Sequence, residues 1–188
     1  MSLRQLAAAA LFLISASAMA AQSFDINLNH NTAMLTYMTP LGQQGFGHGQ
    51  AEGSILFTDS NNYLADVGFG VVGQAGTGSP GLIAGVGVKF YSLTTQHDNV
   101  AALALNGNFD FAPPAVPRLH FSGALNLAPD VVTFIDGNRL YFGDVEVGYE
   151  IFRDAIAYFG VRRIQVGIKG SGDYTLSDGG YIGVRFRF

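Results

Sequence analysis

The sequence lacks cysteine and tryptophan, contains only six prolines in 188 residues, and has a low share of charged residues, 13%. Without cysteine, neither a disulfide framework nor a thiolate metal site is possible. Without tryptophan, tyrosine is the main candidate for an aromatic girdle at a membrane interface. Beyond the first 20 residues there is also no long stretch of helical periodicity, so the sequence does not predict a helical domain.

The first 20 residues have the pattern of a secretory signal peptide. Arg4 precedes the apolar run Leu6 to Ile14, and the small-residue triplet Ala18-Met19-Ala20 follows. The run is too short for a membrane-spanning helix and leads into a cleavage-site pattern. We therefore expect export, removal of residues 1–20 and one mature domain over residues 21–188; an uncleaved anchor is the alternative.

The charge balance of the mature chain is acidic. Without Arg4, nine basic residues stand against 14 acidic ones, and a net charge near −5 disfavours nucleic acid as a partner. Seven of those nine basic residues lie at or beyond Arg139. The C-terminal third is therefore where we expect a charge network.

Apolar residues alternate with glycine and polar residues, a pattern typical of antiparallel strands. Over residues 63–74, for example, Val67 and Phe69 share one face while Asp66 and Gly68 share the other. The same alternation predicts further strands over residues 50–57, 81–93, 100–111, 118–127, 139–152, 155–169 and 179–188.

Residues 21–49 decide the strand count. Apolar side chains occupy even positions from Phe24 to Leu28 and odd positions from Ala33 to Tyr37. A turn at 29–32 accounts for this change of parity and gives two short strands. We predict an all-β fold, an antiparallel up-and-down transmembrane β-barrel of ten strands; eight strands, with residues 21–49 packed elsewhere, is the alternative.

Short connections alternate with longer ones along the predicted strands. Residues 112–117 and 153–154 suit tight periplasmic turns, whereas 128–138 and 170–178 suit longer outer loops. Tyrosines close to strand ends are candidates for interfacial girdles. They are Tyr63, Tyr91, Tyr141, Tyr158 and Tyr181.

The last eight residues divide cleanly between two faces. Ile182, Val184, Phe186 and Phe188 lie on one face of an extended strand, and Tyr181, Gly183, Arg185 and Arg187 lie on the other. The ending resembles the outer-membrane assembly signal, with Tyr181, Gly183, Phe186 and Phe188 at its expected positions. That resemblance implies that the barrel-assembly machinery is a partner during biogenesis.

Charged residues assigned to the inward face form plausible pairs when the hairpins are closed. Asp66 is expected opposite Lys89, and Asp110 opposite Arg118. A larger network is expected from Asp144, Glu146, Arg162, Arg163, Arg185 and Arg187. A second parity change near residue 162 predicts a bulge that turns both Arg162 and Arg163 inward. These charges fit either a packed, hydrogen-bonded interior or a narrow polar conduit.

The sequence contains one possible catalytic pair. His120 and Ser122 share a face, and their H-x-S spacing resembles that of lipid A deacylases. A base needs an orienting carboxylate, but Asn106 and Asn108 are expected opposite the pair. We therefore predict no catalytic residue, no metal site and no cofactor; an envelope hydrolase acting on lipid through His120 and Ser122 stays an alternative.

Three segments together resemble the YfaZ family of bacterial outer-membrane proteins: Gly85 to Tyr91, Ala128 to Val131 and Asp178 to Phe188. The resemblance implies a barrel in the Gram-negative envelope and adds no catalytic residue. We expect a monomer in contact with outer-membrane lipid, acting as a structural or narrow-pore protein. A soluble secreted barrel that binds an apolar ligand would show the same alternation with inside and outside exchanged.

Overall fold

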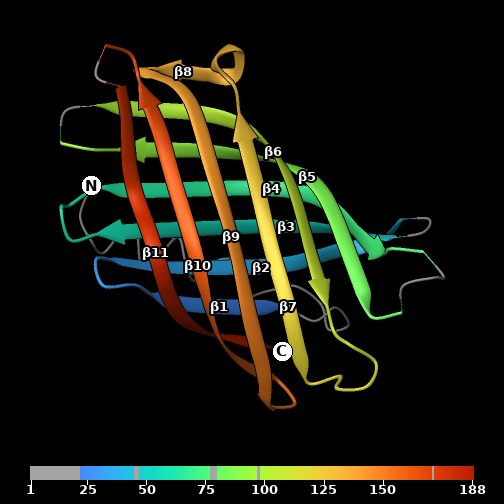
Figure 1. The fold of residues 1–188 in the computed structure, drawn as a ribbon. Coiled ribbons are helices and arrows are strands. Elements are labelled where there is room, and N and C mark those ends of the chain that lie inside the picture. The colour runs from blue at the N-terminus through green and yellow to red at the C-terminus, as the bar shows by residue number, and fades with distance from the viewer. Residues whose placement is uncertain (1–21, 45–46, 77–79, 97, 171) are drawn as a thin grey trace.

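The structure, a computed structural model, describes residues 22–44, 47–76, 80–96, 98–170 and 172–188, so the expected signal peptide lies outside the described residues. The fold is built from strands (Figure 1). They are β1 (Ser23–Leu28), β2 (Thr32–Gln44), β3 (Gly47–Thr58), β4 (Tyr63–Gln74), β5 (Leu82–Thr94), β6 (Asn99–Phe111), β7 (Leu119–Ala128), β8 (Thr133–Ile135), β9 (Gly137–Phe152), β10 (Ala155–Ile168) and β11 (Gly172–Arg187), with a short 3-10 helix η1 (Asp130–Val132).

Ten of these strands close into an antiparallel barrel, which confirms the predicted strand number and fold class. Each wall strand pairs with the next along the chain, β7 pairs with β9, and β11 returns to pair with β1. The eleventh strand, β8, is a short addition that pairs with β6. Among the described residues there is no helix long and apolar enough to cross a bilayer.

The strand boundaries follow the predicted alternation closely, with three differences. The predicted turn near residue 30 is present, where the amide of Asn29 donates to the carbonyl of Thr32 at 2.8 Å. Of the two short strands predicted around it, only β1 is short, because β2 has 13 residues. However, β11 begins at Gly172, so most of 170–178 is strand and the long outer loop predicted there is wrong. Residues 129–136 also contain more structure than a loop, because η1 and β8 lie within them.

The barrel has two distinct ends. Backbone hydrogen bonds between Gln22 and Phe188 mark the terminal end, where the connections 112–118 and 153–154 also lie. The opposite, far end carries β8 and the connection 129–136. In Figure 1 the front wall, made of β7, β9, β10 and β11, crosses the back wall, made of β2 to β5, at a steep angle. Such a crossing is expected for tilted strands in a small barrel.

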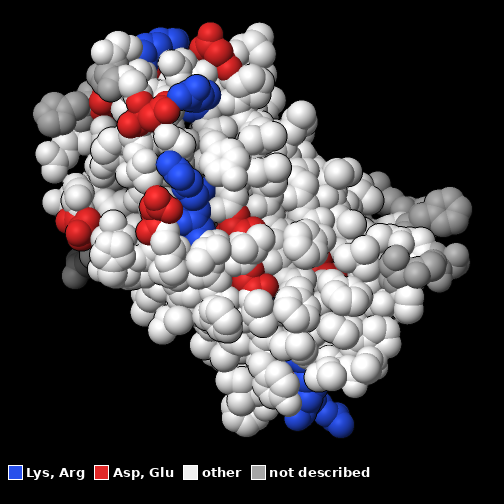
Figure 2. Space-filling model, viewed as in Figure 1, with Lys and Arg blue, Asp and Glu red and all other residues white. Residues whose placement is uncertain are grey.

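The outer surface of the barrel is apolar. Val86, Leu105 and Phe159 point outward and are 71%, 69% and 64% exposed. Figure 2 shows charged residues mostly toward the end that carries β8, above a largely uncharged wall. Such a surface would be unfavourable in water and suits hydrocarbon. The arrangement is that of an outer-membrane-type barrel rather than the soluble alternative.

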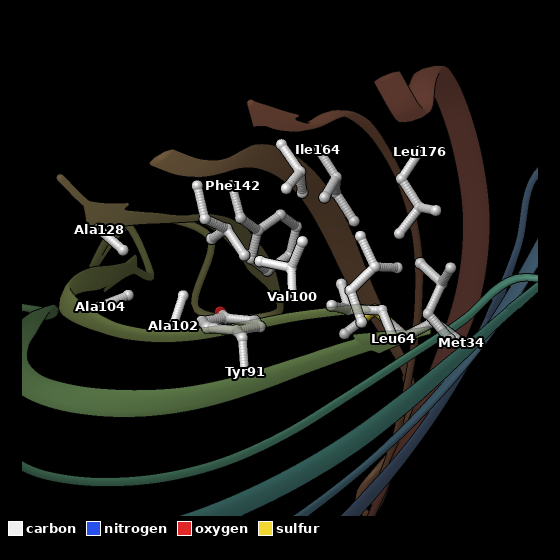
Figure 3. Packing of buried hydrophobic residues seen from close by; sticks show 14 residues of the cluster. Met34, Leu64, Tyr91, Val100, Ala102, Ala104, Ala128, Phe142, Ile164 and Leu176 are labelled. Carbon is white, nitrogen blue, oxygen red and sulfur yellow. The ribbon is translucent and has the colours of Figure 1, made fainter. Parts of the chain in front are cut away.

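The interior differs between the two halves of the barrel. The far half is filled by buried apolar side chains that point toward one another between the walls (Figure 3). The cluster comprises Met34, Leu56, Leu64, Tyr91, Leu93, Val100, Ala102, Ala104, Ala128, Leu140, Phe142, Ile164, Val166 and Leu176. We call it the apolar plug. The expectation of a polar interior therefore holds mainly for the terminal half, while a few buried polar residues such as Asp66 and Asn126 border the plug.

Candidate functional site in the barrel lumen

The terminal half of the lumen is organised around Arg185 at the seam between β11 and β1. Its Nε donates to Oδ2 of Asp25 at 3.0 Å, and its Nη2 donates to Oε1 of Glu146 at 2.7 Å. The Asp25 and Glu146 side chains are 5% and 7% exposed. One guanidinium on β11 thus neutralises two buried carboxylates, one from β1 and one from β9. These ionic contacts join the first strand of the barrel to its last strands.

Two tyrosines complete this seam network, and the sequence analysis placed them elsewhere. Tyr158 donates to Oδ1 of Asp25 at 2.5 Å, and the Tyr181 hydroxyl lies 3.3 Å from Oδ2 of Asp144. The two rings meet edge to face with centroids 5.9 Å apart. Arg185 lies 5.2 Å from the Tyr158 ring and Arg162 lies 4.9 Å from the Tyr181 ring. Two cation–π contacts therefore flank one aromatic pair.

The tyrosines fit because each faces a glycine on the neighbouring strand. Tyr158 is the cross-strand partner of Gly183, and Tyr181 is the partner of Gly160. A Cβ atom at either glycine would overlap the opposite tyrosine ring. The inward glycines therefore leave the space that the aromatic pair occupies.

Arg162 is buried with neutral hydrogen-bond partners. Its guanidinium donates to Oδ1 of Asn27 at 2.8 Å and to Oγ1 of Thr32 at 3.0 Å, and its Nε lies 3.4 Å from Oγ of Ser177. The residue is 3% exposed and lies beside the apolar plug, where Met34 is a further contact. It links β10 to β1, β2 and β11, and it forms no ion pair with a carboxylate of the described residues.

Two predicted members of the charge network lie elsewhere. No bulge turns the arginine doublet inward: Arg162 points into the lumen, whereas Arg163 is exposed on the outer wall opposite Gly143 and Asp178. Arg187 is on the same face as Arg185 but only partly buried, and it has no ion pair with any described residue. The structure thus brings together Asp144, Glu146, Arg162 and Arg185, and leaves Arg163 and Arg187 outside this group.

Lys89 forms a second charged group in the lumen. Its Nζ lies 2.5 Å from Oε1 of Glu52 and 3.9 Å from Oδ1 of Asp66. Asp66 is directly opposite Tyr91 rather than Lys89, and its other oxygen accepts from Ser54. The predicted Asp66–Lys89 pair is therefore a long contact, and Glu52 is the nearer partner that the sequence analysis missed.

Asp110 joins His120 and Ser122 rather than Arg118. Asp110 is the register partner of Ser122, accepts from its hydroxyl at 3.0 Å and lies 3.1 Å from Nδ1 of His120. Arg118 is exposed in the turn before β7, so the predicted Asp110–Arg118 pair is wrong. The expectation that no carboxylate faces the His120–Ser122 pair is wrong as well.

This Asp-His-Ser group is not arranged as a catalytic triad. In a triad the serine hydroxyl donates to histidine, and the carboxylate holds the far side of the ring. Here the Ser122 hydroxyl donates to Asp110 itself. The same carboxylate accepts from both side chains, which is the arrangement of a hydrogen-bonded interior. Within the described part of the chain, no group of three His, Asp or Glu side chains could hold a metal ion.

The predicted girdle tyrosines divide between the two faces. Tyr63 and Tyr141 are exposed on the outer wall, whereas Tyr91, Tyr158 and Tyr181 are buried inside, so the girdle prediction is wrong for these three. In the predicted assembly signal, Phe186 and Phe188 are exposed on the outer face and Tyr181 and Gly183 face inward. The Tyr–Gly partners Tyr158 and Gly183 could have been found by closing the last hairpin in register.

Comparison with known proteins identifies the family of this chain. A comparison with curated proteins gives no match. Among solved structures, the chain is similar to the KdgM porin at 11% identity, with a TM-score of 0.46 over 89% of this chain and 99% of the porin. It is also similar to the outer-membrane channel DcaP of Acinetobacter baumannii at 10% identity, with a TM-score of 0.46 over 89% of this chain and 62% of DcaP. The family described as YfaZ precursor matches residues 1–188, the whole sequence. The chain therefore belongs to the YfaZ family.

Proposed function

We propose that this protein is a closed, structural barrel of the bacterial outer membrane, exported by a cleaved signal peptide. The terminal end faces the periplasm, where the C-terminal signal ending in Phe186 and Phe188 is available to the barrel-assembly machinery. The far end then faces outward. The apolar outer wall supports membrane insertion, and the completed ring of strand pairs supports a monomer, because no strand edge of the barrel wall is left for a second copy.

The main observation in favour of a closed lumen is the apolar plug. Leu56 and Val166 are 0% exposed, and Tyr91 and Leu93 are 1% exposed, although all four point into the lumen. The plug draws on every wall strand except β1. Ions need polar groups or water along their route, whereas the packed side chains of the plug are apolar except for the hydroxyl of Tyr91. The charged terminal half therefore ends at an apolar barrier and does not form a conduit through the barrel.

Planar-bilayer recording tests this proposal. The purified protein, checked for the heat-modifiable mobility of a folded barrel, should give no steady single-channel conductance. A double variant, Leu56→Ala with Leu93→Ala, removes plug volume and should produce measurable current if the plug is the barrier. Steady conductance by the unaltered protein would contradict a closed structural role.

A gated cation pathway is a second candidate, favoured by the charge of the lumen. Acidic side chains outnumber basic ones among the buried and half-buried inward residues. The acids are Asp25, Glu52, Asp66, Asp110, Asp144 and Glu146, and the bases in contact with them or with the aromatic pair are Lys89, Arg162 and Arg185. An opened lumen should prefer cations. The reversal potential of the plug variant in a salt gradient would show this preference; anion selectivity would exclude it.

The histidine–serine group is proposed to be structural rather than catalytic. Because Ser122 donates to Asp110, its hydroxyl is not hydrogen-bonded to His120, the histidine that would have to remove its proton in a triad. Neither the parent nor Ser122→Ala should hydrolyse esters or lipid A. Turnover by the parent that is lost in Ser122→Ala would establish the hydrolase instead.

A further inference from the structure

Arg163 lies on the outer wall, at the edge of the band of exposed apolar residues that surrounds the barrel. We call this band the apolar belt. On β10 the outward residues toward the terminal end are Phe159 and Val161, which are 64% and 56% exposed. The next outward residue toward the far end is Gln165, opposite Tyr141. Arg163 is therefore the first charged position on this strand above the belt. An arginine on the lipid face of a barrel is costly near the bilayer centre, and the cost falls toward the interface.

A hollow of about 800 Å³ lies beside Arg163 on the same wall. Gly107, Gly123 and Gly143 contribute no side chain to the outward faces of β6, β7 and β9, and apolar residues line the hollow around them. Val145 and Val161 are among these residues and are 53% and 56% exposed. The hollow thus combines an apolar lining, suited to hydrocarbon, with a guanidinium at its border.

The guanidinium of Arg163 is available to a ligand. The neighbouring outward arginine, Arg139, already binds Asp173 at 2.5 Å. Arg163 has no ion pair with any residue that the structure describes, although Asp178 is its cross-strand partner and lines the same hollow. A guanidinium matches phosphate in a bidentate geometry. The nearby carboxylate would oppose an anion, so Arg163 must supply the attraction.

We propose that this hollow binds a phosphorylated, acylated glycolipid of the lipid A type, with a phosphate on Arg163 and an acyl chain against Val145 and Val161. The choice of a glycolipid rests on the proposed orientation, which places the far end in the outer leaflet. Such a lipid has an anionic phosphate at the border of the apolar belt and acyl chains directly below the phosphate. This arrangement matches Arg163 and the apolar lining of the hollow.

The test is binding of purified diphosphoryl lipid A to the full mature chain folded in uncharged detergent micelles, followed by native mass spectrometry. Arg163→Gln should weaken binding about tenfold, the loss expected for one charge-assisted contact. Arg153→Gln, an exposed arginine in a terminal-end turn, is the matched control and should bind as the parent does. Lipid A stripped of phosphate should bind the parent and Arg163→Gln equally.

Two further variants separate the parts of the site. A Cβ at Gly107 would meet nothing within 4 Å, so Gly107→Leu should fold and fill the hollow, weakening lipid A with or without phosphate. Asp178→Asn removes the opposing carboxylate and should tighten binding of the phosphorylated form. Equal binding by Arg163→Gln and Arg153→Gln, weaker binding by Asp178→Asn, or equal affinity for phosphatidylglycerol would overturn the proposal. Heat-modifiable mobility and conductance of the same samples report separately on the closed barrel.

Discussion

The hydroxyl of Tyr158 lies 2.5 Å from Oδ1 of Asp25, a contact that reaches from β10 to β1 past the intervening strand β11. Tyr91 is also buried, but its hydroxyl is without a hydrogen-bond partner in the described part of the structure. The two tyrosines therefore allow a direct comparison. Removing a hydrogen-bonded hydroxyl should lower the free energy of unfolding, whereas removing a buried hydroxyl without a partner should not.

Tyr158→Phe should lower the free energy of unfolding by about 1 to 3 kcal/mol, since Asp25 loses a charge-assisted donor. Tyr91→Phe should leave stability unchanged or raise it slightly, because it removes a buried polar atom that forms no hydrogen bond. Urea titration of both variants in micelles, followed by heat-modifiable mobility, measures the difference. Equal losses in the two variants would contradict the assigned role of the Tyr158 hydroxyl.

Asp25→Ala should destabilise the barrel by about 3 kcal/mol or more, because Arg185 loses one of its two carboxylate partners within a buried network. Asp173→Asn is the control, since it breaks an ion pair whose Arg139 side chain is 63% exposed and should leave the unfolding midpoint in place. If both variants unfold at the same urea concentration, the seam network contributes no more than a surface ion pair.

Phe188→Ala should reduce the yield of membrane-embedded protein without changing the stability of the fraction that folds. The side chain is 66% exposed on the outer face, whereas the backbone hydrogen bonds to Gln22 persist in the variant. Phe152→Ala, also highly exposed and at the same end, is the control. Fractionation and heat-modifiable mobility in cells supply the measurement, and matched yields of the two variants would remove the assembly role.

Gly183→Ala should displace the Tyr158 ring, because the added Cβ would overlap it. The result should resemble Tyr158→Phe or be more severe, since backbone from β1 also lies close to that Cβ. A loss of stability in Gly183→Ala combined with Tyr158→Ala that is smaller than the sum of the two single losses would demonstrate the coupling. Gly107→Ala, where the added atom is in open space, is the control and should be neutral.

Alternation of side chains predicted the strands because it reflects backbone geometry, which holds whichever way the apolar residues face. The doublet Arg162–Arg163 shows the limit of that reasoning. Apolar residues do change parity there, from Phe159 and Val161 to Ile164 and Val166, but no bulge causes it. The inward face itself becomes apolar when β10 enters the plug, and local sequence carries no information on how neighbouring strands fill the same space.

Cross-strand partners were harder to predict than faces. Each hairpin connection sets the register of its strands, and a small difference in its length moves every pair along the sheet. The connection 112–118 places Asp110 opposite Ser122 instead of Arg118, and the connection after β4 moves Asp66 two positions from Lys89. The seam contacts of Asp25 with Arg185 and Tyr158 depend on closure of the whole ring, so no short segment of sequence could reveal them.

The ionic seam has a consequence for unfinished molecules. Asp25 and Arg185 are 160 residues apart in the sequence, and Glu146 shares the same guanidinium. A polypeptide truncated before its final strand would retain both carboxylates but lack their counter-ion. Closure of such a fragment would leave unpaired negative charge in the barrel interior. Incomplete copies should therefore stay open and accessible to proteases, while full-length copies close.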